Sequence, residues 1–262
     1  MASAAAIGGL MLGFGTASAD TFTSVASQGN GGYERCLTGS GSASITAGSG
    51  DSCSTGTKSN YYNGALSIAQ LVADDLSATH GGSAVTLTRL DDGNPNKSLF
   101  TYMAGPPSTQ VEAIARYAGN GNTFGIIPGT SGGSYTNLLG ALANNKVLVQ
   151  SNTTFGDANS HGDIVTNASI GTIALPALPD GSYFRPAIQG PGGSYTFSSL
   201  ISDNPNLLDH LVAYKITGLD PDQEANGIFS YLLGFEDGYG STTTLGDADY
   251  EDYVIELDFS AV

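Results

Sequence analysis

The sequence predicts a mainly β protein, built as a β-sandwich or jelly-roll-like fold with one or two short helices. Segments of strand length recur along the chain between turns rich in Gly and Pro, which is typical of sandwiches and barrels. The composition agrees, because 37 Gly, 13 Tyr and only 12% charged residues among 262 are typical of secreted β-rich proteins.

The clearest strand pattern lies near the end of the chain, at residues 253–259. Large apolar residues stand there at every second position: Tyr253, Ile255, Leu257 and Phe259. A period of two predicts a strand with one buried face. An apolar run of strand length at residues 229–235 precedes it, so we expect two neighbouring strands joined by the loop between them.

The remaining elements are predicted from apolar spacing and turn composition. Apolar residues at helical spacing predict a short helix within residues 61–78, and residues 137–144 predict a second one. Further strands are expected at residues 84–90, 111–117, 123–127, 146–150, 171–175, 183–188 and 211–216.

The chain divides into three regions by composition. Residues 1–19 resemble a secretory signal without its basic start, since an apolar stretch is followed by the small residues Ala17, Ser18 and Ala19. This segment is too short to span a bilayer. Residues 20–60 form a Gly- and Ser-rich N-terminal region, and residues 61–262 are expected to form the β-sandwich domain.

Two cysteines, Cys36 and Cys53, lie in the N-terminal region. In an exported protein we expect them to form a disulfide, which stabilises a loop of this size by roughly 3 kcal/mol. Two free thiols are the alternative. A zinc pair is disfavoured because no further Cys or nearby His completes a ligand set.

The charge balance limits the classes of partner. A net charge of −16 disfavours nucleic acid, whose phosphates require Lys and Arg. An acidic surface is instead suited to divalent cations.

The loop between the two C-terminal strands is rich in Gly and Thr and contains no Lys or Arg. Its candidate metal ligands are Glu236, Asp237, Asp247, Asp249 and Asp252. Like charges this close repel unless a cation lies among them, so we interpret the loop as an oxygen cage for Ca²⁺. A solvated acidic loop remains the alternative.

An EF-hand does not fit this loop. Counted from Asp247, the sixth position is Asp252 where the turn requires Gly, and the twelfth is Asp258 within the predicted strand. Any metal bound here therefore lies at the rim of a sheet.

Three stretches resemble a family of secreted bacterial domains of unassigned function, found in PEP-CTERM-type surface proteins and calcium-dependent adhesins. They are LTRLDDGNPN with VEAIARYAGNGNTFGII, then DHLVAYKI, then YLLGFEDGYG with GDADYEDYVIEL. The resemblance covers about residues 84–259 and implies a β-sandwich with calcium-binding acidic loops. The five acidic residues above stand at the matching positions, although the loop is longer here, and Ala248 replaces a residue that is often basic.

Two enzyme patterns are weighed and set aside. Residues 129–133 match the nucleophile-elbow pattern G-x-S-x-G around Ser131, but Pro128 and the Gly/Ser composition favour a plain loop. The clustered carboxylates do not suit a glycosidase, which needs two acids facing each other across a cleft. We expect His210 to make a structural hydrogen bond.

The sequence therefore predicts an exported, calcium-binding structural or adhesive module of the cell surface or extracellular matrix, without enzyme activity. Its partner is expected to be a second copy of itself, forming a homopolymer or filament, or a surface glycan. No membrane span is expected. The alternative function is a calcium-dependent lectin or glycan-acting hydrolase.

Overall fold

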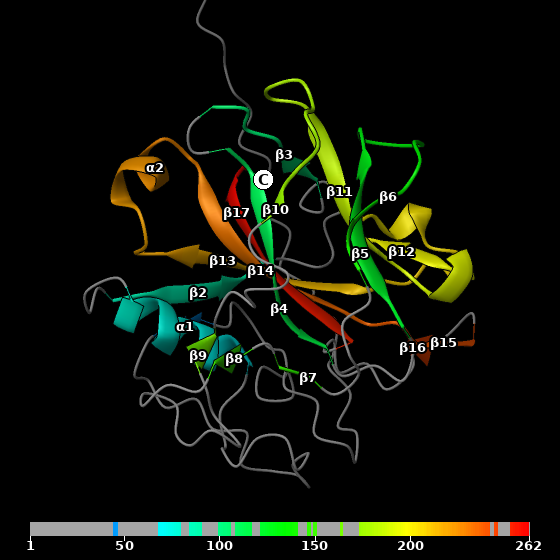
Figure 1. The fold of residues 1–262 in the computed structure, drawn as a ribbon, viewed down its shortest axis with the longest axis horizontal. Helices are drawn as coiled ribbons and strands as arrows, with labels where there is room; N and C mark the ends of the chain where they lie inside the picture. The colour runs from blue at the N-terminus through cyan, green and yellow to red at the C-terminus, as the bar shows by residue number, and fades with distance from the viewer. Residues whose placement is uncertain are drawn as a thin grey trace, which may run out of the picture.

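In the computed structural model the chain forms two antiparallel sheets that pack face to face (Figure 1). The structure describes residues 44–46, 68–79, 84–90, 99–105, 108–116, 121–140, 146–147, 149–150, 163–164, 173–241, 244–245 and 252–261. The prediction of a mainly β fold with two sheets and short helices is confirmed. Jelly-roll connectivity stays a prediction.

The larger sheet contains the strongest apolar strands at its centre. Its order is β1 (Ser44–Thr46), β2 (Thr86–Arg89), β13 (Leu211–Thr217), β14 (Phe229–Phe235), β17 (Tyr253–Ser260), β4 (Gln110–Arg116) and β10 (Ile173–Ala174), with β7 (Lys146–Val147) also paired to β4. The strands predicted at residues 211–216, 229–235 and 253–259 are thus found in adjacent positions.

The smaller sheet lies beside it, on the right in Figure 1. Its order is β12 (Thr196–Ser198), β11 (Tyr183–Gln189), β5 (Thr123–Pro128) and β6 (Thr136–Leu139), with β3 (Phe100–Thr101) paired to β11. Two further antiparallel sheets have two short strands each: β8 (Val149–Gln150) with β9 (Asp163–Ile164), and β15 (Tyr239–Ser241) with β16 (Thr244–Leu245).

Aromatic rings from both sheets meet in the core between them. Phe100 lies 5.2 Å from Tyr231, and Phe124 lies 6.1 Å from both Phe235 and Tyr253, measured between ring centroids. All five of these side chains are buried. Because each such ring buries a large apolar area, these cross-sheet pairs hold the two layers together.

The large sheet is buried on its second face as well, and here the prediction of one buried face for β17 is wrong. Val254 and Glu256 point away from the inter-sheet core but are only 2% and 7% exposed. The same outer face carries buried Tyr214 and Ile216 on β13, next to β2, and helix α1 (Ile68–Thr79) packs against β2. The outer face is therefore buried at β13 and β17, which the strand pattern does not encode.

The predicted helix at residues 61–78 is confirmed as α1 within its described part. The predicted helix at residues 137–144 is wrong in its first part, because Thr136–Leu139 forms β6 beside β5. The antiparallel pairing supplies backbone partners that local spacing cannot show. Sequence analysis missed the short helix α2 (Pro221–Ala225) and the 3-10 turns η3 (Pro191–Gly193) and η4 (Ile201–Asp203).

Two further predictions concern regions that the structure leaves undescribed. Cys36, Cys53 and the signal-like segment at residues 1–19 lie outside the described residues. Among the described helices, none is both long and apolar enough to cross a membrane.

Candidate metal centre

Three of the predicted ligands, Glu236, Asp237 and Asp252, come together at one rim of the large sheet. Glu236 and Asp237 follow the last residue of β14, and Asp252 directly precedes β17. These strands are antiparallel neighbours, so the end of one and the start of the other meet at the same edge. The other two predicted ligands, Asp247 and Asp249, lie outside the described residues.

The three carboxylates offer oxygens at distances that suit a common ion. One oxygen from each side chain lies within 4.8 Å of the others. Two oxygens that each lie about 2.4 Å from one Ca²⁺ can be no more than about 4.8 Å apart. The trio therefore meets the distance condition for shared coordination.

The carboxylates of this trio are buried, unlike those of a solvated loop. Glu236 is 0%, Asp237 7% and Asp252 6% exposed. Backbone N–H groups turn them inward: Gly238 N–H donates to Glu236 Oε1 at 2.7 Å, and Asp237 N–H donates to Asp252 Oδ2 at 2.5 Å. Such donors favour ionised carboxylates and hold them in place.

The smaller sheet also reaches this site through Asn122, the residue before β5. Asn122 is fully buried, and its Nδ2 donates to Asp237 Oδ2 at 2.5 Å. Tyr195, just before β12, donates its hydroxyl hydrogen to Asn122 Oδ1 at 2.7 Å. The chain Tyr195–Asn122–Asp237 thus joins both sheets at the acidic rim.

His210 fixes the backbone of Glu236 from two sides. The Glu236 N–H donates to the His210 carbonyl oxygen at 3.1 Å, and His210 Nδ1 donates to the Glu236 carbonyl oxygen at 2.7 Å. The imidazole also stacks on Phe197, with ring centroids 3.6 Å apart. The predicted structural hydrogen bond of His210 is confirmed.

Burial lowers the pKa of His210 to about 4, and the hydrogen bond to Glu236 opposes this shift. The ring is therefore neutral at pH 7, with its proton on Nδ1 and a lone pair on Nε2. Asn206 Oδ1 lies 3.0 Å from Nε2, while the buried Asn206 Nδ2 has no hydrogen-bond partner among the described residues. If the side-chain amide of Asn206 were rotated by 180°, its Nδ2 would donate to His210 Nε2. The 3.2 Å hydrogen bond from Leu208 N–H to Asn206 Oδ1 would then be lost.

Sequence reasoning missed Asn122 and Tyr195 as neighbours of the acidic residues. Asn122 follows a Gly/Asn turn, and a single Asn in such a setting carries no signal beyond the turn itself. Asn122 and Asp237 are 115 positions apart, so only the packing of the two sheets reveals the contact.

The nucleophile-elbow pattern at residues 129–133 lies in the loop between antiparallel strands β5 and β6. An elbow requires a strand followed directly by a helix, and the element after this loop is a strand. The prediction of a plain loop at Ser131 is confirmed.

Comparison with protein-family models, with curated proteins and with solved structures found no match to this chain. The resemblance to secreted bacterial surface domains therefore stays a prediction from sequence.

Proposed function

We propose that this protein is an exported structural or adhesive module of the cell surface or extracellular matrix, stabilised by Ca²⁺ at the rim of its large sheet. The observation that carries the proposal is the buried trio of Glu236, Asp237 and Asp252, with carboxylate oxygens within 4.8 Å of one another. Export rests on the signal-like pattern of residues 1–19.

A hard cation explains why three acidic side chains are buried together. Ionised carboxylates are costly to bury, and their mutual repulsion adds to this cost unless an opposite charge compensates it. Ca²⁺ takes six to eight oxygens in flexible geometry, whereas Mg²⁺ requires a smaller and more regular shell. Asp247 and Asp249 belong to the same loop and are the proposed additional ligands.

The position of the trio favours a structural role for the ion. Ca²⁺ bound here would connect the end of β14 to the start of β17, and Asn122 links Asp237 to the smaller sheet. An ion that binds only the folded state stabilises it by RT ln(1 + [L]/Kd), about 2.7 kcal/mol when calcium is at a hundred times Kd.

Thermal unfolding of the full chain with CaCl₂ or with EGTA tests this proposal. We expect the Tm to rise in calcium, and the rise to vanish in the double variant Asp237→Asn with Asp252→Asn. Asp222→Asn is the matched control, because Asp222 is an exposed carboxylate on α2, and it should keep the full calcium response.

Titration calorimetry of the wild-type protein with calcium provides a readout that does not depend on the variants folding. Saturable heat with a stoichiometry of at least one ion supports the site. Equal Tm values in calcium and EGTA, together with no binding heat, would leave only a buried acidic cluster.

A further inference from the structure

The two edges of the small sheet differ in what covers their backbone groups. Strand β6 forms one edge. Strands β12 and β3 form the other, because both pair with β11 on the side opposite to β5. On β3, the Thr101 N–H already donates to the carbonyl oxygen of Ala261 at 2.8 Å. An edge whose backbone groups are unpaired is a template for a further strand, so the covering decides where the sheet can extend.

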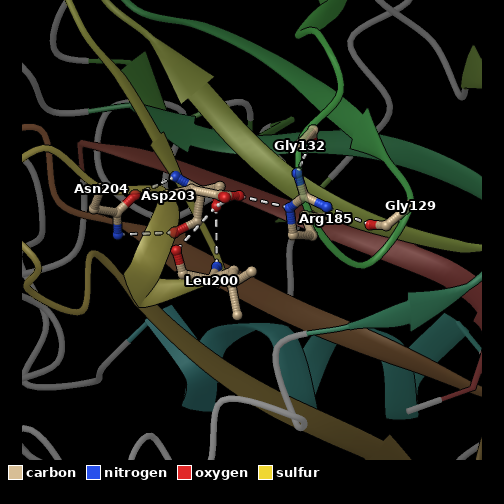
Figure 2. A network of polar contacts seen from close by, with 7 residues as sticks. Gly129, Gly132, Arg185, Leu200, Asp203 and Asn204 are labelled. Atoms are coloured by element: carbon tan, nitrogen blue, oxygen red, sulfur yellow. Dashed lines mark hydrogen bonds and ion pairs between the residues drawn. The ribbon is translucent and has the colours of Figure 1, made fainter.

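The β12 edge is closed by the side chain of Asn204. The Ser199 N–H donates to the Pro186 carbonyl oxygen on β11, so the backbone groups of Ser198, one residue earlier, point away from β11. Asn204 Oδ1 accepts from the Ser198 N–H at 2.8 Å, and Asn204 Nδ2 donates to the Ser198 carbonyl oxygen at 3.1 Å (Figure 2). The side-chain amide therefore takes the place of a neighbouring strand.

The β6 edge is open at Asn137. The Gly129 N–H donates to the Tyr183 carbonyl oxygen, so every second residue of β5, counted back from Gly129, bonds to β11. Ile126 lies between these positions and bonds to β6 at Thr136. The N–H and C=O of the next residue, Asn137, therefore point to the outside. Asn137 is exposed, and neither backbone group has a hydrogen-bond partner among the described residues.

Buried contacts fix the turn that leads into β6. Arg185 on β11 is 0% exposed, and its two terminal nitrogens donate to the carbonyl oxygens of Gly129 and Gly132 (Figure 2). Its Nε donates to Asp203 Oδ2 at 2.6 Å. The turn at residues 129–134 is thus tied to the body of the sheet. An edge that is already ordered loses less conformational entropy when it pairs.

The distribution of charge favours a second copy of this chain as the partner of β6. The net charge is −16, so two copies repel each other over most of their surfaces. Residues 117–145, which include β5 and β6, contain no charged residue. The open edge therefore lies in the part of the sequence where two acidic chains can approach without bringing like charges together.

We propose that two copies pair through antiparallel β6 strands about a two-fold axis near Asn137. Each copy presents the same edge, so the contact is self-complementary, and the N–H and C=O of Asn137 in one copy bond to those of Asn137 in the other. Because the opposite edge of the small sheet is covered, no further copy adds to this sheet, and the assembly closes as a dimer. This inference goes beyond the proposed function and does not depend on calcium.

Sedimentation velocity of the full chain in EGTA tests the proposal, with NaCl screening the net charge. We expect the mass to rise with protein concentration and to stop at two chains. A mixture of isotope-labelled and unlabelled chains then locates the contact by NMR, and we expect intermolecular NOEs between backbone protons of residues 136–139 in the two copies. A monomer at every concentration, growth beyond two chains, or NOEs to another segment would overturn the proposal. Since EGTA removes calcium, failure of the metal site would not change these results.

Two variants at one position test whether the backbone of β6 makes the contact. Asn137→Pro removes the outward N–H, and proline is tolerated on an edge strand where the N–H faces solvent, so we expect dimer formation to be lost. Asn137→Ala keeps this N–H and should dimerise like the wild type. Dimerisation of the Pro variant at wild-type concentrations, or its loss in the Ala variant, would contradict pairing through the backbone. The NOE measurement uses the wild-type chain and does not depend on either variant folding.

Discussion

Arg185 and His210 have polar or charged side chains that are completely buried, and each makes several hydrogen bonds. Arg185 bonds to Asp203 and to the loop at residues 129–134, while His210 bonds to Glu236 through both its backbone and its ring. Buried polar groups of this kind contribute to stability only while their partners and protonation states stay matched.

His210 makes stability depend on pH. Its pKa is lowered from 6.5 to about 4 in the folded protein, chiefly by burial, so the unfolded chain binds more protons between these values. The free energy of unfolding is therefore unaffected by this titration above about pH 6.5 and decreases as the pH falls toward 4. The loss due to His210 amounts to about 3 kcal/mol.

The titration of the His210 ring by NMR in EGTA checks this prediction directly. A midpoint near 4 is expected, and a midpoint at or above 6.5 would contradict it. Urea unfolding from pH 7 to pH 4 should show a shallower loss of stability in His210→Gln than in the wild type. The variant carries every other titrating group, so the difference between the two curves isolates His210.

At the scale of elements, the hairpin of β5 and β6 depends on a close approach at Gly125. A Cβ at this position would lie 2.1 Å from the carbonyl oxygen of Thr136 and 2.8 Å from the ring of Tyr135. The Tyr135 hydroxyl also shares a 2.9 Å hydrogen bond with Thr123 Oγ1, which keeps the ring across the hairpin. Only glycine therefore allows this pairing without displacing backbone.

Gly125→Ala is expected to destabilise the protein by about 3 kcal/mol or more, because the clash is with backbone and a packed ring. Gly105→Ala is the control, since a Cβ there would meet nothing within 4 Å. Urea unfolding of both variants measures the effect. A Gly125 variant as stable as the Gly105 variant would show that the two strands can separate easily.

For the whole molecule, the two sheets are joined at more than one place. The Tyr195–Asn122–Asp237 chain joins them at the acidic rim. A second junction lies at the end of β17, where Thr101 N–H donates to the Ala261 carbonyl oxygen at 2.8 Å and Ser260 Oγ donates to the Thr101 carbonyl oxygen at 2.8 Å. With these contacts and the shared aromatic core, we expect the sheets to behave as one unit.

The outer edge of the small sheet leads to a prediction about assembly. Within the described residues, β6 pairs only with β5, and Thr136 and Asn137 are exposed. Such an edge can accept a strand from another copy. We therefore expect the full chain to self-associate in sedimentation velocity, and Thr136→Lys with Asn137→Lys to reduce the association because charges on an edge oppose pairing.

Ser202→Lys with Ala225→Lys adds the same charge at exposed positions away from this edge and serves as the control. If both pairs of substitutions reduced self-association equally, the cause would be a general effect of added charge. A monomer at all concentrations, with and without calcium, would rule out a self-assembling module.

The sequence by itself determined the positions of the two C-terminal strands and the grouping of acidic residues between them. The apolar run at residues 229–235 is β14 with the same bounds, and the alternation at residues 253–259 lies within β17. Both patterns are local, since they depend on side chains alternating along one strand. The proximity of Glu236 to Asp252 also follows from two adjacent antiparallel strands.

Only the tertiary structure decided which distant side chains meet. Asn122 contacts Asp237, and Arg185 bonds to carbonyl groups of the loop at residues 129–134. Glu256 is buried, although its alternating pattern predicts an exposed side chain. The physical reason is that alternation along a strand shows which side chains lie on the same face of the sheet. It does not show which other residues pack against that face. Strand order and sheet packing supply the covering residues, and both depend on contacts between segments far apart in the chain.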